Sequence, residues 1–142
     1  MAFCCALRVR YAETDQMGIV YHANYFTWFE IARTEYMRSL GQSYRQIEDL
    51  GIMLPVAEVS CRYLAPAHYD DELEIVISLT SIGAASLCFT YQVLRPVDGT
   101  LLAFGQTKQA FVGRNMRPLN CKRQFPELWT MLEQQLSNST SC

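Results

Sequence analysis

The sequence has no long hydrophobic run, no excess of basic residues and no paired cysteine motif. Its apolar stretches fall short of the ~18 to 20 residues that cross a bilayer, so we expect no membrane span. The 12 basic and 14 acidic residues give a formal net charge of −2. Nucleic-acid binders usually carry a basic surface. We therefore expect no nucleic-acid partner, and an anionic ligand must be held by a few placed groups.

The cysteines do not have the spacing of a zinc site. No Cys-x-x-Cys pair is present and no histidine cluster lies near them, so we predict no metal. A chain of 142 residues that is 50% hydrophobic has no need of disulfides to stabilise its core. We expect reduced, mostly buried thiols and, since no secretory leader pattern opens the sequence, a cytoplasmic protein. The cysteines are Cys4, Cys5, Cys61, Cys88, Cys121 and Cys142.

Hydrophobic periodicity predicts one strand, one long helix, four more strands and a final helix. Residues 2–11 alternate as a strand. A helix follows, capped by Asn24 and ended by Gly41, because apolar residues recur there at steps of three and four. This helix is so apolar in its first half that we expect other elements to surround it. Its apolar positions are Tyr25, Phe29, Ala32, Tyr36 and Leu40, widened by Phe26 and Trp28.

The remaining strands are predicted as a meander, after a short polar helix or turn at 42–50. Asp98-Gly99 is a strong hairpin signal, and Pro126 suits the first position of the last helix. A long antiparallel sheet and an apolar helix must bury their faces against each other, which predicts an α+β fold with the sheet curled around the helix. We expect one domain over residues 1–136 and a frayed tail over 137–142, with sheet edges that pair with a second copy. The predicted strands span 52–64, 72–81, 86–95 and 100–112.

The stretch from Tyr11 to Tyr25 is the best candidate for chemistry. Asp15 lies in a turn and could act as a nucleophile or as a general base for water. The start of the helix, around His22 and Ala23, offers free N–H groups and a positive dipole end for a developing oxyanion. Ester or thioester hydrolysis fits this arrangement.

Each of these residues also has an ordinary role that spacing alone favours. Asp15 and Gly18 suit a turn, His22 suits a helix cap or the core, and Tyr25 suits the core. Asp70-Asp71 is a second carboxylate pair that we interpret as a strand-start turn.

Three blocks of sequence carry a family resemblance. The run Asp15-x-x-Gly18-x-Val20-x-His22-x-x-Tyr25, residues 26–33 and residues 63–73 resemble the hotdog-fold acyl-CoA thioesterases of the 4-hydroxybenzoyl-CoA thioesterase group. The resemblance is greatest to the bacterial branch associated with the Tol-Pal system, and it covers residues 5–136. It implies a five-stranded antiparallel sheet wrapped around one long helix, with a C-terminal helix, in homodimers that pair into homotetramers. It also implies an acyl-CoA substrate and no cofactor.

The resemblance further implies roles for single residues. Asp15 matches the catalytic aspartate, and His22 matches the position whose backbone N–H polarises the thioester carbonyl. Tyr25 matches the last residue of the motif and shapes the acyl pocket. Independently of the resemblance, we place Gly18 and Arg62 in the expected substrate-binding set as well. The 4-hydroxybenzoyl enzyme has an aromatic residue where this chain has His22, which argues against that aryl substrate.

Several alternatives stay open at this point. The chain could be a hotdog dehydratase or hydratase, a non-catalytic acyl-CoA-binding module, or a thioesterase for acyl carrier protein or an aryl-CoA such as dihydroxynaphthoyl-CoA. Cations for the coenzyme A phosphates could come from Arg62, Lys108, Arg114 and Arg117, each of which could equally be a solvated surface charge. Expected walls of the acyl pocket are Tyr25, Phe26, Phe29 and Met53.

Overall fold

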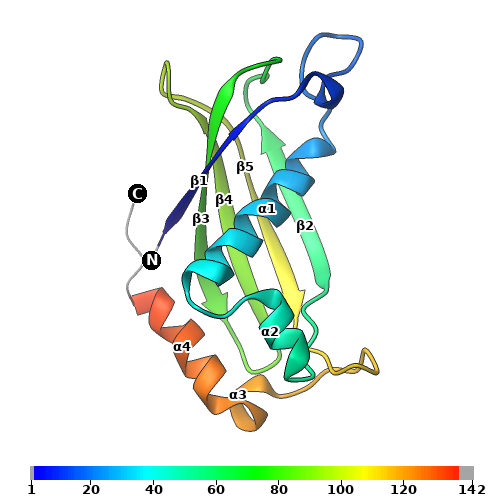
Figure 1. Cartoon of the computed structure of the whole chain (residues 1–142), viewed down its shortest axis with the longest axis vertical. Helices are drawn as coiled ribbons and strands as arrows, with labels where there is room; N and C mark the ends of the chain where they lie inside the picture. Colours follow the sequence, from blue (N-terminus) through cyan, green and yellow to red (C-terminus); the bar gives the residue numbers. More distant parts are fainter. Residues whose placement is uncertain (1, 138–142) are drawn as a thin grey trace.

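A computed structural model of the chain describes residues 2–137. Its elements are β1 (Phe3–Arg8), a 3₁₀ turn (Tyr11–Glu13), α1 (Asn24–Ser39), α2 (Tyr44–Asp49), β2 (Val56–Tyr63), β3 (Glu72–Ile82), β4 (Ser86–Arg95), β5 (Thr100–Ala110), α3 (Cys121–Gln124) and α4 (Pro126–Ser137). The five strands form one antiparallel sheet in the order β1-β3-β4-β5-β2. Figure 1 shows α1 lying across one face of this sheet, with α3 and α4 at its lower end. The predicted α+β architecture is confirmed.

β2 is not the sheet neighbour of β3, although it precedes β3 in the chain. It pairs with β5 at the far edge, so the prediction of a four-strand meander is wrong, and only β3, β4 and β5 follow one another in this way. β2 also begins at Val56 rather than at Ile52. Met53 makes only an isolated bridge, and Pro55 has no N–H to donate to a ladder.

The alternation predicted for β3 and β4 places every second side chain against α1. These side chains are at most 1% exposed: Leu73, Ile75, Ile77, Leu79, Leu87, Phe89, Tyr91 and Val93. Phe3, Cys5 and Leu7 of β1 are partly buried against the same core. The sheet face toward α1 is therefore the apolar one, as the sequence pattern requires.

The two ends of α1 are stabilised differently from each other. The N-cap residue is Ala23, so the predicted cap role of Asn24 is wrong. Asn24 instead donates its side-chain N–H to the backbone carbonyl of Glu13 at 2.8 Å. At the other end, Gly41 has φ +81° and donates its N–H to the carbonyl of Arg38. This left-handed conformation favours glycine and ends the helix as predicted.

α1 packs tightly against the sheet at Phe29. The Phe29 ring stacks on the Tyr91 ring with centroids 4.2 Å apart. A Cβ atom on Gly105 would lie 2.5 Å from the Ser60 carbonyl oxygen and 2.8 Å from the Phe29 ring. Only glycine permits this approach at β5. Burial of a side chain such as Phe29 contributes about 2 kcal/mol to stability.

The cysteines follow the prediction only in part. Free thiols occur at four of the described positions: Cys5, Cys61, Cys88 and Cys121. Of these, only Cys121 is buried. Cys4 is disulfide-bonded, so the prediction of reduced thiols is wrong there. The prediction was argued from the size of the apolar core. A large core makes a disulfide unnecessary for stability, but it does not prevent two cysteines from lying close enough to form one. Cys142 lies outside the described residues.

The C-terminal helix α4 begins at Pro126, as predicted. Its buried side chains Leu128, Trp129 and Leu132 face the core, and the Trp129 indole donates to the Gly83 carbonyl at 2.9 Å. Ser137 is the last residue of α4, and the rest of the predicted tail lies outside the described residues. This helix covers the lower end of the sheet in Figure 1.

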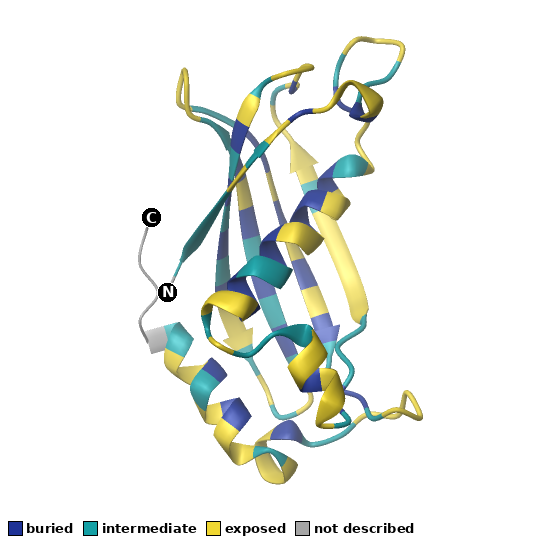
Figure 2. Ribbon diagram, viewed as in Figure 1, coloured by how far each residue is buried: buried dark blue, intermediate teal, exposed yellow. Residues whose placement is uncertain are grey.

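One side of α1 and the edge strand β2 are open to solvent in the single chain (Figure 2). Seven of the eight residues of β2 are exposed, among them Val56 and Val59. Phe26 and Ile31 of α1 are also exposed. The expectation that other elements surround α1 is therefore met only on the side that faces the sheet. Long exposed edge strands commonly pair with another chain.

Candidate active site

A short two-stranded ladder before α1 carries Asp15. At one end of the ladder the Glu13 carbonyl accepts the Tyr21 N–H at 2.9 Å. At the other end the Asp15 N–H donates to the Ile19 carbonyl at 2.9 Å, and an isolated bridge lies between these two bonds. Asp15 therefore lies at the tip of a loop whose second arm continues directly into the entrance of α1.

The Asp15 carboxylate is half-buried and is held in a turn. One of its oxygens, Oδ1, accepts the Met17 N–H at 2.9 Å. Gly18 has φ +78° and donates its N–H to the Asp15 carbonyl at 2.9 Å. The turn roles that spacing favours are thus confirmed. The second oxygen, Oδ2, accepts no hydrogen bond from residues 2–137, so it is available to a water molecule or a substrate.

Glu13 joins the Asp15 loop to α1, and sequence reasoning missed it. Its side chain is buried, and Oε2 accepts the indole N–H of Trp28 at 2.9 Å. Oε1 accepts the backbone N–H of Arg10 at 2.8 Å. The Glu13 carbonyl accepts two more bonds, from the Tyr21 N–H and from the Asn24 side chain. One residue therefore sets the position of the loop relative to the first two turns of the helix.

The entrance of α1 presents two unpaired backbone donors. The N–H groups of His22 and Ala23 find no acceptor within the described residues. Unpaired N–H groups and the positive end of a helix dipole together suit a developing oxyanion. The His22 ring lies 4.5 Å from the Tyr21 ring and 6.2 Å from the Tyr63 ring, between centroids. Its imidazole makes no hydrogen bond to Asp15 in the described chain, so these two side chains do not form a pair.

Tyr25 lies in the core beneath this entrance. It is 2% exposed, and its ring packs 4.6 Å from Trp28 and 4.9 Å from Tyr63, between centroids. Burial raises the pKa of the Tyr25 phenol to about 12, so it stays protonated at neutral pH. The core role that spacing favours is confirmed, and its role as an acyl-pocket wall stays a prediction.

A hollow of about 330 Å³ lies between α1, α2 and the chain that leads into β2. Met53 lines this hollow, whereas Phe29 is buried in the core and Phe26 is exposed on α1, so the role of these residues as acyl-pocket walls stays a prediction. Arg33 also lines the hollow; it is buried and donates to the Tyr91 hydroxyl at 3.2 Å. It makes no ion pair with the described residues. The hollow thus combines apolar side chains with Arg33 and with two acidic residues, Glu30 and Glu48.

Arg62 lies on the sheet face that points away from α1. Its guanidinium is 5.9 Å from the centroid of the Phe104 ring. It lines a broad hollow of about 1240 Å³ over this outer face, together with small polar side chains such as Ser78 and Thr90. Arg62 directly precedes Tyr63, and the Tyr63 ring contacts the His22 ring at the entrance of α1. Among the four candidate cations, Arg62 is the one bonded to a residue that contacts this entrance.

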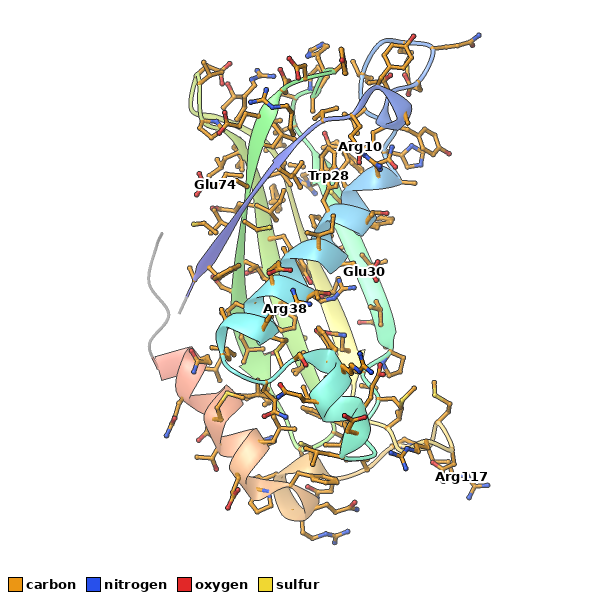
Figure 3. All side chains as sticks on the ribbon, viewed as in Figure 1. Arg10, Trp28, Glu30, Arg38, Glu74 and Arg117 are labelled. Atoms are coloured by element: carbon orange, nitrogen blue, oxygen red, sulfur yellow. The ribbon has the colours of Figure 1, made fainter. Side chains whose placement is uncertain are left out.

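The other candidate cations lie away from Asp15 within one chain. Lys108 is exposed on β5, where it pairs in register with Glu58. Arg114 and Arg117 lie in the loop after β5. Figure 3 shows Arg117 at the end of the molecule opposite Arg10, which contacts the Asp15 loop. The chain itself therefore does not bring these three cations to the loop.

Residues 2–137 contain no group of three or more His, Cys, Asp or Glu side chains that could hold a metal ion. No described helix has the length and apolar character needed to cross a bilayer.

A five-stranded antiparallel sheet with the long helix α1 across one face is the hotdog architecture. Residues 17–102 match the family model described as Thioesterase superfamily, a segment that covers more than half of the chain, includes His22, Ala23 and Tyr25, and begins two residues after Asp15. The chain belongs to this superfamily.

Individual relatives agree with this assignment. The acyl-CoA thioester hydrolase YbgC of Escherichia coli O6:H1 is 38% identical over 96 residues, which is 68% of this chain and 71% of that protein. The 1,4-dihydroxy-2-naphthoyl-CoA hydrolase of Synechocystis sp. is 28% identical over 123 residues, 86% of this chain and 87% of that protein. The crystal structure of the DHNA-CoA thioesterase of Staphylococcus aureus superposes with a TM-score of 0.89 at 30% identity, covering 96% of this chain and 93% of the other. The predicted hotdog fold and the thioesterase family are confirmed.

Proposed function

We propose that this protein hydrolyses the thioester bond of an acyl-CoA, with Asp15 as its catalytic carboxylate. The observation that carries the proposal is the set of bonds made by Glu13. It binds the Asp15 loop and α1 together, so the carboxylate and the N–H groups of His22 and Ala23 keep a fixed relative position. A thioester carbonyl aimed at these donors gains stabilisation as negative charge develops on its oxygen.

Asp15 can act in either of two ways. As a nucleophile it attacks the carbonyl carbon, forms an anhydride with the acyl group and expels the coenzyme A thiolate. Water then opens the anhydride. As a general base it takes a proton from the attacking water. In both cases the C–S bond breaks and the thiolate gains a proton. In the general-base route the oxygen added to the acyl group comes from water. In the nucleophilic route it comes from the Asp15 carboxylate, and water attacking the Asp15 carbonyl carbon of the anhydride restores the oxygen that Asp15 gave up. After a single turnover in ¹⁸O-water, label in the Asp15 carboxylate identifies the nucleophilic route, since a general base exchanges only protons.

The test of the proposed activity is a hydrolysis screen. Purified protein is mixed with short, long and aryl acyl-CoAs, and free thiol is detected with a thiol reagent. We expect thiol release from at least one substrate class. Tight acyl-CoA binding without thiol release would instead identify a non-catalytic binding module. The same acyl groups loaded on acyl carrier protein show which carrier the enzyme prefers.

An aryl acyl group is a second candidate for the substrate. The similarity to the two dihydroxynaphthoyl-CoA hydrolases favours it, because one of them matches over nearly the whole chain at 30% identity. Within the superfamily, the run from Asp15 to Tyr25 and the similarity to YbgC favour the 4-hydroxybenzoyl-CoA thioesterase group and its Tol-Pal-associated branch. The screen therefore includes 1,4-dihydroxy-2-naphthoyl-CoA. The rate of its hydrolysis relative to that of a short aliphatic acyl-CoA decides whether the preferred acyl group is aryl or aliphatic.

The functional unit that we propose is a homodimer formed through β2, with homotetramers formed by pairs of dimers. The exposed length of β2 and its apolar residues Val56 and Val59 support an edge-to-edge pairing. Light scattering of the purified protein is expected to give two or four times the mass of the chain. The mass of a single chain would contradict this assembly. The cytoplasmic location stays a prediction of the sequence.

A further inference from the structure

Two hydrogen bonds in series connect the backbone of Asp15 with a buried carbonyl outside its own loop. The Asp15 N–H donates to the Ile19 carbonyl at 2.9 Å. The same peptide group carries the Val20 N–H, which donates to the Ala67 carbonyl, also at 2.9 Å. Peptide groups are planar and no cis peptide bond occurs in the described chain, so the two ends of this group point in opposite directions. The position of the Asp15 backbone therefore depends on where Ala67 lies.

The series continues from Ala67 to a carboxylate. The peptide group of the Ala67 carbonyl carries the His68 N–H, which donates to Oδ2 of Asp71 at 2.9 Å. Asp71 lies directly before β3, and its own N–H closes a turn on the His68 carbonyl at 3.1 Å, so its interpretation as a turn residue is confirmed. Three hydrogen bonds through two peptide groups thus join the side chain of Asp71 to the backbone of Asp15.

A cation holds the Asp71 carboxylate in place. One guanidinium nitrogen of Arg95, the last residue of β4, lies 3.3 Å from Oδ2 of Asp71 and also donates to the Pro66 carbonyl at 3.3 Å. The other nitrogens of Arg95 bind the Asp98 carboxylate. The Arg95 and Asp71 side chains are 18% and 23% exposed, so solvent and salt screen their attraction only in part. Arg95 therefore fixes both the carboxylate and the chain just before Ala67.

The charge at the far end of the series strengthens each of its hydrogen bonds. Ala67 is fully buried and Val20 is 5% exposed, so the middle bond lies away from water. Hydrogen bonds in series polarise one another, and a carboxylate that accepts the His68 N–H makes the Ala67 carbonyl a stronger acceptor. The bond from Val20 is strengthened in turn, which makes the Ile19 carbonyl a stronger acceptor for the Asp15 N–H.

We propose that Asp71 is a positioning residue for Asp15. Through the peptide groups of His68 and Val20, its carboxylate fixes the backbone of the loop that presents Asp15 to the thioester. Asp71 has no direct part in the reaction. The inference rests on the proposed thioesterase function, and it gives a role to one member of the carboxylate pair Asp70-Asp71, since the Asp70 side chain does not belong to the series.

The test compares Asp71→Asn with Asp70→Asn. Asparagine at position 71 keeps an oxygen for the His68 N–H but removes the charge. Asp70 is the matched control, because its exposed carboxylate lies 3.6 Å from Arg8 and asparagine tolerates its φ of +70°. A displacement of about 1 Å costs about 100-fold in rate, so we expect loss of the charge alone to lower kcat by about 3- to 20-fold, with KM changed by less than about twofold. Asp70→Asn should leave both constants unchanged.

A second measurement separates positioning from a general structural role. The ¹⁵N and ¹H shifts of the Val20 and Asp15 amides report the last two hydrogen bonds of the series, whether or not the protein turns over a substrate. In Asp71→Asn we expect both amide protons to move upfield, the direction of a weaker hydrogen bond, and in Asp70→Asn we expect neither to move. A lower kcat with a moved Asp15 signal supports the inference. An unchanged kcat or an unmoved Asp15 signal overturns it.

A backbone variant tests the first bond directly if Asp71→Asn is poorly folded. The α-hydroxy analogue of histidine at position 68 replaces the N–H by an ester oxygen and leaves the side chains of Asp71 and Arg95 unchanged. The inference then requires kcat to fall, and an unchanged kcat overturns it. If the wild-type protein releases no thiol from any thioester, the proposed function fails. In that case the Asp15 amide shift in Asp71→Asn still decides whether Asp71 positions the loop.

Discussion

The indole N–H of Trp28 donates to the carboxylate of Glu13 at 2.9 Å, and both side chains are buried. This bond connects the second turn of α1 with the loop that carries Asp15. A hydrogen bond to a charged acceptor is roughly twice as strong as a neutral one, and it is stronger still away from water. The loop that carries Asp15 is therefore held by a specific polar contact as well as by the chain that leads into the helix.

Glu13→Gln tests this contact. Glutamine offers one oxygen where the structure has two acceptors, for the Trp28 indole and for the Arg10 N–H. Either the buried Trp28 indole or the partly buried Arg10 N–H then loses its partner, and we expect the free energy of unfolding to fall by about 1–3 kcal/mol. The kcat for thioester hydrolysis should also fall, because the Asp15 loop is less well held. Urea unfolding and the thiol assay measure the two effects.

Glu30→Gln is the matched control for that variant. Glu30 is exposed on α1 and makes no ion pair or hydrogen bond with the described residues. It should leave stability within about 0.5 kcal/mol of the wild-type value. If Glu13→Gln behaves like Glu30→Gln in both assays, Glu13 does not hold the loop.

Gly105→Ala is expected to be strongly destabilising. The added Cβ would lie 2.5 Å from the Ser60 carbonyl oxygen and 2.8 Å from the Phe29 ring, so β2 and α1 must both move. Overpacking of this kind costs about 1–3 kcal/mol or more. At Gly83 the nearest atom to an added Cβ is 3.9 Å away, so Gly83→Ala is expected to change stability by less than about 1 kcal/mol. Equal melting temperatures for the two variants would contradict the packing described at Phe29.

Tyr36→Phe is expected to stabilise the protein. The Tyr36 hydroxyl is buried and has no hydrogen-bond partner among the described residues, so its removal relieves a desolvation cost of about 1 kcal/mol. Tyr91→Phe is the matched comparison, since the Tyr91 hydroxyl is 2.6 Å from the Thr107 hydroxyl and accepts from Arg33. That variant should be destabilised by about 1–3 kcal/mol. Chemical denaturation gives both values, and a loss of stability in Tyr36→Phe would contradict the prediction.

Local pattern was enough to predict most elements of the fold. The alternation in β3 and β4 and the three-and-four spacing in α1 each describe one face. Those faces are buried as predicted, except that Phe26 of α1 is exposed and Leu40 is only partly buried. The position of β2 beside β5 could not be predicted in the same way. The strand pairs at the far edge of the sheet, and the partner of an edge strand depends on the path of the connection rather than on its own residues. The cap of α1 was misassigned because Asn24 bonds a distant carbonyl, that of Glu13, which no local rule includes.

The site was predictable where residues act through their neighbours in the chain. Asp15 and Gly18 form a turn with their neighbours, and their pattern is visible in sequence. Glu13 was missed because a glutamate is expected on the surface, although a buried tryptophan indole such as that of Trp28 requires an acceptor. Tyr63 was missed as a donor because it meets His22 only in the folded chain.

The most direct test of the account is Asp15→Asn, assayed for thiol release from the best acyl-CoA of the screen. Asparagine can keep the turn bond to the Met17 N–H but supplies neither a nucleophile nor a base. We predict that kcat/KM falls at least about 100-fold while the melting temperature stays within a few degrees of the wild-type value. Asp49→Asn, an exposed position in α2, should keep full activity. Hydrolysis by Asp15→Asn at the wild-type rate would contradict the assignment of Asp15 as the catalytic carboxylate.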